Sequence, residues 1–132
     1  MARNIKDALL ESTKAFPAAE ANNTCDAIDL GQATGGELEN VVVEVEVPEL
    51  TALVATKTAT FTFQHGDAAD SLAATDPAIT HVITGATGNG YAGGKCQFRL
   101  PPSCKRYIAV NCEVAAAGGD NTAKSYTMRV LV

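Results

Sequence analysis

The chain has no tryptophan, and aromatic residues make up only 5% of its 132 residues. It has 10 Lys and Arg against 15 Asp and Glu, which gives a formal net charge of -5. This is the wrong sign for a surface that follows nucleic-acid phosphates. No apolar run approaches the roughly 18 residues that a membrane-spanning helix needs. Direct binding to nucleic acid and insertion into a membrane are therefore not expected.

Metal and redox motifs are also missing. The four cysteines form no C-x-x-C pair and have no histidine near them in sequence, so neither zinc nor any other cofactor is expected. The four are Cys25, Cys96, Cys104 and Cys112. The first 21 residues carry charges such as Asp7, Glu11 and Lys14 where a secretory signal needs an apolar core. We therefore expect a soluble protein made in a cytoplasm, with reduced cysteines acting as small buried hydrophobes.

The composition instead favours a sheet protein with a core of small aliphatic residues. Hydrophobic residues make up 46% of the chain and charged residues 19%, and valine, alanine and threonine are abundant. Residues 41–47 alternate, with valines on one face and Glu44 and Glu46 on the other, which predicts an antiparallel strand with a solvated outer face. Residues 58–64 and 105–114 alternate in the same way and predict two further core strands.

Weaker strand patterns cover 25–31, 78–83, 96–100 and 125–132, and 67–77 is predicted to be a loop that could hold one helical turn. Seven or eight short strands without alternating helices predict an all-β antiparallel sandwich, with the jelly roll as the leading topology. We assign residues 25–132 to a single sandwich domain and residues 1–24 to an N-terminal arm. Propensity within the arm favours a short helix that Pro17 stops, although it has no clean cap.

Possible catalytic patterns are better explained as turns. Residues 88–93 match G-x-G-x-x-G, but a strand rather than a helix follows them, which contradicts a dinucleotide site. His65 and Asp67 flank a glycine without a recognisable nucleophile, and His81 is expected on the solvated face of its strand. Glu44 and Glu46 have the spacing of any pair on a strand face and no aromatic sugar platform beside them. No catalytic residue is assigned, and we expect a protein that is not an enzyme.

Several segments together resemble a known family. Their order is Leu-Leu-Glu-Ser at 9–12, Ala-Ile-Asp-Leu-Gly at 27–31, the valines of 41–47, T-F-T-F-Q at 60–64, R-Y-I-x-V at 106–110 and a strand that ends at Val132. In this order the chain is similar to the capsid decoration, or cement, proteins of tailed bacteriophages. The resemblance covers most of the chain.

The resemblance implies a jelly-roll homotrimer that binds the major capsid protein on the virion surface and stabilises the shell. The candidate contacts with the capsid or with other copies are Leu9, Leu10, Phe16, Tyr91 and Tyr107. The alternative is a carbohydrate- or receptor-binding sandwich module that uses Tyr91 and Tyr107 as platforms. A hydrolase that uses His65 is a third and more distant interpretation.

Overall fold

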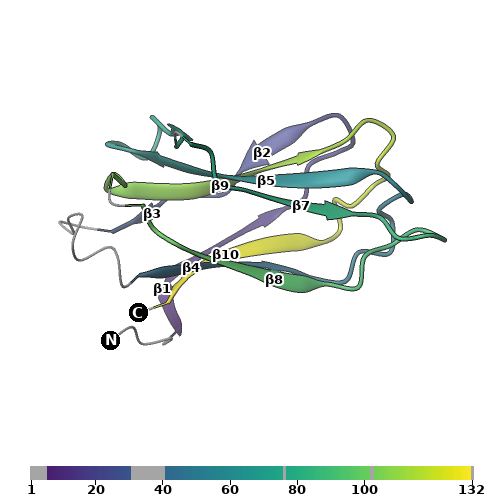
Figure 1. Ribbon diagram of the computed structural model, residues 1–132, viewed down its shortest axis with the longest axis horizontal. Coiled ribbons are helices and arrows are strands. Elements are labelled where there is room, and N and C mark those ends of the chain that lie inside the picture. Colours follow the sequence, from purple (N-terminus) through teal and green to yellow (C-terminus); the bar gives the residue numbers. More distant parts are fainter. Residues whose placement is uncertain (1–5, 31–40, 76, 102, 132) are drawn as a thin grey trace.

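The computed structural model describes residues 6–30, 41–75, 77–101 and 103–131, and every regular element in them is a β-strand. The strands form two antiparallel sheets stacked as two layers (Figure 1). Sheet A has the order β1 (Lys6–Ala15), β10 (Ser125–Leu131), β4 (Val42–Val47) and β8 (Gly94–Arg99). Sheet B contains β2 (Asn22–Thr24) and β3 (Ile28–Asp29) beside β9 (Tyr107–Val114), then β5 (Thr58–Gly66), then β6 (Ala73–Ala74) and β7 (Thr80–Thr84). None of the described residues belongs to a helix that could span a membrane.

The strand pairs are nested along the chain. β1 pairs with β10, β2 and β3 with β9, β4 with β8, and β5 with β7. This is a long antiparallel hairpin rolled into two sheets, and the pairs β10·β4 and β9·β5 complete the layers. Such nesting is the jelly-roll arrangement. The all-β antiparallel sandwich predicted from alternation is therefore confirmed.

The core contains the alternating residues that the sequence placed inward. Val43, Val45 and Val47 of β4 are at most 2% exposed, as are Phe61 and Phe63 of β5. On β9 and β10, the inward residues are Ile108, Val110, Cys112, Val114, Tyr126, Met128 and Val130. Because these strands are buried on one face and pair on both sides, a register shift of one residue would expose the whole apolar set.

The N-terminal segment is built into the sandwich. Residues of β1 pair with β10 from Lys6↔Leu131 to Ala15↔Ser125, with one irregularity between Lys6 and Glu11. The expectation of a short helix is therefore wrong. Pairing with β10 satisfies backbone groups of β1 that an isolated helix would have to satisfy alone, and the Ser12 hydroxyl adds a 2.6 Å hydrogen bond to the Asp26 carbonyl.

Other boundaries differ locally from the sequence predictions. Of the strand expected over 25–31, the described residues form only β3 at Ile28–Asp29; β2 comes before that range, and the buried Cys25 lies between β2 and β3. The described residues of 67–77, which leave out 76, form turns, bends and β6 and no helical turn. β7 begins at Thr80, two residues later than expected. Strand pairing is set here by the neighbours β9 and β5, and local alternation does not encode those neighbours.

Candidate binding faces on the two sheets

Two outer faces of the sandwich gather polar side chains, one on each sheet. On sheet A, the cross-strand register aligns Glu11 of β1, Arg129 of β10, Glu44 of β4 and Gln97 of β8 in one row. The next row aligns Thr13, Thr127, Glu46 and Lys95. We call these two rows the charge ladder.

Arg129 is the centre of the charge ladder. Its Nε donates to Glu11 Oε1 at 2.8 Å, and its Nη1 donates to Glu46 Oε1 at 2.7 Å and to Glu44 Oε2 at 3.4 Å. Its side chain is 16% exposed. These hydrogen bonds, above all the one to Glu46, raise the pKa of the guanidinium. Arg129 therefore fixes carboxylates from three positions on two neighbouring strands.

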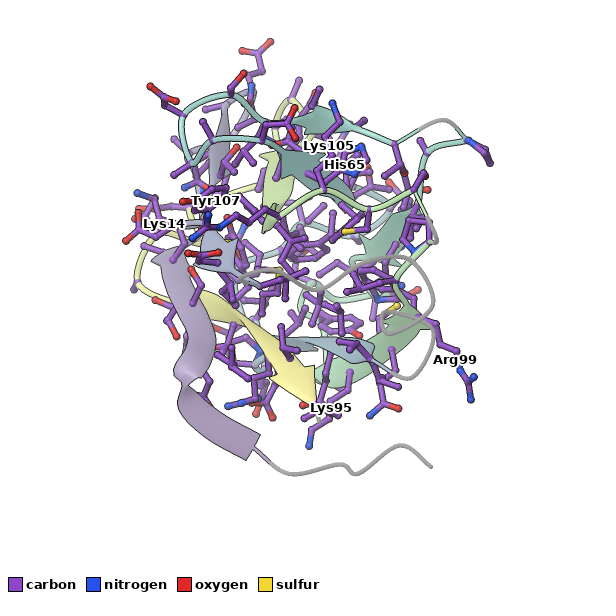
Figure 2. The ribbon with its side chains drawn as sticks, turned by 90° about the vertical axis from the view of Figure 1, so that its left-hand side faces the viewer. Lys14, His65, Lys95, Arg99, Lys105 and Tyr107 are labelled. Carbon is purple, nitrogen blue, oxygen red and sulfur yellow. The ribbon has the colours of Figure 1, made fainter. Side chains whose placement is uncertain are left out.

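Glu44 is only 3% exposed, so its predicted place on a solvated face is wrong. Alternation put its side chain on the correct side of the strand. Glu44 is shielded from solvent by side chains of the two flanking strands. Arg129 and Gln97 are its cross-strand partners, and Gln97 Nε2 donates to Glu44 Oε1 at 3.0 Å. Burial of this carboxylate is tolerated because both partners are in place. Lys95, which points away from the body of the molecule in Figure 2, lies 3.7 Å from Glu46 at the rim of the ladder.

On sheet B, a trough of about 700 Å³ crosses the outer face. Its lining consists of Asn22, Thr24, Cys25, Asp26, Ala27, Gln64, Ala69, Asp70, Leu72 and Asn111, and we call it the polar trough. The Asn111 amide donates to Thr24 Oγ1 at 3.0 Å and to Asn22 Oδ1 at 3.2 Å, so the floor is held across β2 and β9. Gln64 extends the floor onto β5.

The segment 67–72 forms a wall of the polar trough because Gly66 lets it fold over the end of β5. A Cβ at Gly66 would collide with the Ser71 carbonyl. Within the described part of the chain, the side chains of Gln64, Asp26 and Asp70 make no hydrogen bond. Amide and carboxylate groups in this state can bind the hydroxyl and amide groups of a ligand. The lining contains no aromatic ring on which a sugar could stack.

Comparison with known proteins gives distant structural likeness alone. No family model matches the chain, and no curated protein matches it. A solved structure described as xylan-binding module CBM15 is 9% identical, with a TM-score of 0.46 over 97% of this chain and 95% of that one. Murine APRIL is 9% identical, with a TM-score of 0.39 over 92% of this chain and 98% of that one. A family 16 carbohydrate-binding module is 7% identical, with a TM-score of 0.39 over 87% of this chain and 73% of that one.

Likeness at this level says nothing about ligand or partner, and the sandwich is established by the strand pairing of the chain itself.

The sequence-predicted contact residues are scattered. Phe16 is 2% exposed and packs in the core, so it is not available to a partner in this fold. Leu10 is half-buried against the core, and the side chain of Leu9 lies outside the described residues. Tyr91 forms a bridge with Leu50, and the neighbouring Gly90 N–H donates to the Leu53 carbonyl, five residues before β5 begins, whereas Tyr107 pairs with Gly66 at the other end of β5.

The two tyrosines therefore do not form one platform. β5 rises roughly 26 Å from Thr58 to Gly66 at about 3.3 Å per residue. Tyr107 instead lies under the Arg106 guanidinium, 5.3 Å from the ring centre. Arg106 in turn donates to both carboxylate oxygens of Asp29, at 2.7 and 2.8 Å.

His65 is not arranged as a catalytic base. Its Nδ1 accepts a 3.1 Å hydrogen bond from the Lys105 backbone N–H, and the two residues lie side by side in Figure 2. Partial burial, together with the nearby Lys105 charge, lowers the pKa of His65. Asp67 pairs with Lys105 at 3.7 Å. The neighbouring Cys104 is a free thiol whose pKa is raised to about 11 by burial, so the structure does not supply a thiolate there.

The remaining cysteines are also free thiols, and Cys25 and Cys112 are buried as expected. Burial raises the pKa of Cys112 to about 12, which agrees with a packing role. No cluster of three or more His, Cys, Asp or Glu residues suited to a metal ion occurs in the described ranges. Residues 88–93 form the loop between β7 and β8, with left-handed φ at Gly88, Asn89, Gly90 and Gly93, and lead into a strand.

Sequence reasoning missed both polar faces. The register between distant strands creates the charge ladder, and a folded-over loop creates a wall of the polar trough. The only available signal was the outward position of Glu44, Glu46, Gln64 and Asn111 in alternating segments.

Proposed function

We propose that this protein is a non-enzymatic decoration subunit of a bacteriophage capsid, which binds the assembled shell as a homotrimer and stabilises it. The observation that carries the proposal is the agreement between the fold that the family resemblance implies and the observed nesting of strands. Two of the three main resembling segments, 60–64 and 106–110, lie in or directly before the paired core strands β5 and β9, and the third begins with Ile28 and Asp29 of β3. A protein that binds only the assembled shell stabilises it by mass action, and three linked copies add avidity.

The charge ladder supports this proposal as a contact surface. Its side chains are already fixed by hydrogen bonds across all four strands of sheet A. A surface ordered before binding loses less side-chain entropy when a partner covers it. Charged groups held in one arrangement also select a partner of complementary charge. The proposed partner is the major capsid protein.

A charge reversal on the ladder tests this contact. We expect Lys95→Glu to weaken co-sedimentation with expanded phage heads by at least about tenfold, because like charges placed at an interface are strongly unfavourable. Lys105→Glu is the matched control, since both lysines are about half exposed and each lies 3.7 Å from one carboxylate. Sedimentation equilibrium of the unchanged chain should give the mass of a trimer. A monomer that does not co-sediment with heads would contradict the proposal.

A second candidate function is carbohydrate binding in the polar trough. It is favoured by the amide and carboxylate side chains that line the trough without hydrogen-bond partners of their own in the described residues. This site lies on sheet B, so it does not compete for the charge ladder. Without an aromatic platform, binding would depend on hydrogen bonds to sugar hydroxyls, each of modest net strength.

Glycan-array binding distinguishes the two candidate sugar sites. If the trough binds a glycan, Gln64→Ala should weaken that binding about 3- to 10-fold, the value of one hydrogen bond, and Tyr91→Ala should leave it unchanged. Loss of binding in Tyr91→Ala alone would assign the sugar to the loop after β7. An array without any signal would leave decoration as the sole proposed function.

A further inference from the structure

A small apolar cavity opens between the two sheets at one edge of the sandwich. Its volume is about 230 Å³, and it lies between β7 of sheet B and β8 of sheet A, which Figure 1 shows in the two stacked layers. We call it the edge slot. Its lining consists of Val45, Phe61, Phe63, Ile79, Thr80, His81, Cys96, Gln97, Phe98 and Val110. It borders the charge ladder at Gln97 and shares no residue with the polar trough.

The walls of the edge slot are aromatic and fixed. Phe63 packs edge-to-face against Phe98, with ring centres 5.1 Å apart. Phe61 stacks with His81 at 6.3 Å and an interplanar angle of 25°. His81 lies opposite Phe61 across the β5·β7 pair and therefore faces inward, so its predicted place on a solvated face is wrong. Rigid rings on two sides favour a flat ligand.

Two polar groups are available inside the slot. The side chains of His81 and Cys96 make no hydrogen bond to any residue that the structure describes. Cys96 lies opposite the buried Val45 and points inward from β8. The imidazole can accept a hydrogen bond from a ligand, and the thiol is a weaker partner. A ligand with one O–H or N–H group could therefore donate a hydrogen bond to the imidazole, which a pure hydrocarbon cannot do.

Protein interiors rarely leave apolar space of this size empty. A cavity of about 150 Å³ lined by Leu, Ile and Phe is large enough to bind benzene. The edge slot is about one and a half times that volume and carries one strong hydrogen-bond acceptor. We propose that it binds a small neutral aromatic molecule of one or two rings that bears an O–H or N–H, with indole and phenol as the simplest examples.

Site-resolved alkylation tests the proposal on the native chain. With millimolar indole, we expect iodoacetamide to modify Cys96 at least about fivefold more slowly, because a ligand in the slot covers the thiol. Cys104 is the internal control, since it is also half-buried and free but does not line the slot. Mass spectrometry of the peptides separates the two sites. Equal protection of both cysteines, or of neither, would overturn the proposal.

Two variants sharpen the test. Cys96→Phe fills the slot and should abolish indole binding measured by calorimetry. His81→Phe keeps a ring in place and should weaken indole binding about 3- to 10-fold, as expected for one lost hydrogen bond, while it leaves toluene binding nearly unchanged. Unchanged indole binding in Cys96→Phe would show that indole binds elsewhere. If the native chain does not bind indole and Cys96→Phe dissociates the multimer, the slot receives a side chain from a neighbouring copy and the proposal is wrong.

Discussion

Replacing Arg129 by methionine is expected to lower the free energy of unfolding by about 3–5 kcal/mol, as found when one partner of a buried ion pair is removed. The reason is Glu44, whose carboxylate is 3% exposed and would keep only the hydrogen bond from Gln97. Total stabilities of single domains are about 5–15 kcal/mol, so this loss is a large fraction. Urea denaturation at neutral pH measures it.

Two controls separate the buried charge from general damage to sheet A. The double variant Arg129→Met with Glu44→Gln should recover more than half of the lost free energy, because no unpaired charge remains. Lys95→Met breaks only the exposed 3.7 Å pair with Glu46 and should cost less than about 1 kcal/mol. A loss for Arg129→Met as small as that for Lys95→Met would show that Glu44 is hydrated in the folded protein.

Alternation along each strand was sufficient to predict the fold. β4, β5, β9 and β10 lie within two residues of their predicted bounds, and their inward residues form the core. The period of two reports which face a side chain occupies, and burial of one face fixes it. It does not report what lies beside that side chain on the next strand. Glu44 was therefore predicted on the correct side of its strand but is buried and not solvated, and His81 was predicted on a solvated face but faces inward; the residues beside them, Arg129 and Phe61, are remote in sequence.

The N-terminal segment shows a second limit of local pattern. Its composition is compatible with a helix, and nothing within 6–15 indicates a partner strand. β10, more than a hundred residues later, supplies the pairing edge. Contacts between segments distant in sequence also create the polar trough and the edge slot, because each is lined by residues from both halves of the chain. Neither site could be assembled from sequence without the pairing of strands.

Phe16→Ala is expected to cost about 3–5 kcal/mol of unfolding free energy, the usual range for removing a buried phenylalanine ring. The ring is 2% exposed and packs edge-to-face against Phe61 and Tyr126, with centres 6.0 and 5.4 Å away. Removal of the ring creates a cavity directly after the end of β1, and the Phe61 and Tyr126 rings lose an aromatic neighbour. Urea denaturation gives the free energy, and sedimentation under folding conditions gives the state of association.

This variant also decides between two roles for Phe16. If Phe16 is a core residue, Phe16→Ala should greatly lower stability and leave any self-association of the folded fraction unchanged. If Phe16 is a contact residue, the variant should weaken self-association and leave stability nearly unchanged. Phe16→Leu, which keeps an apolar side chain of similar size, should lose less than about 1.5 kcal/mol. Val82→Ala serves as the surface control, since Val82 is 51% exposed and should change stability by no more than about 0.5 kcal/mol. Dissociation of the proposed trimer by Phe16→Ala without loss of stability would place the ring at a subunit interface and would require a different packing of β1 on the sandwich.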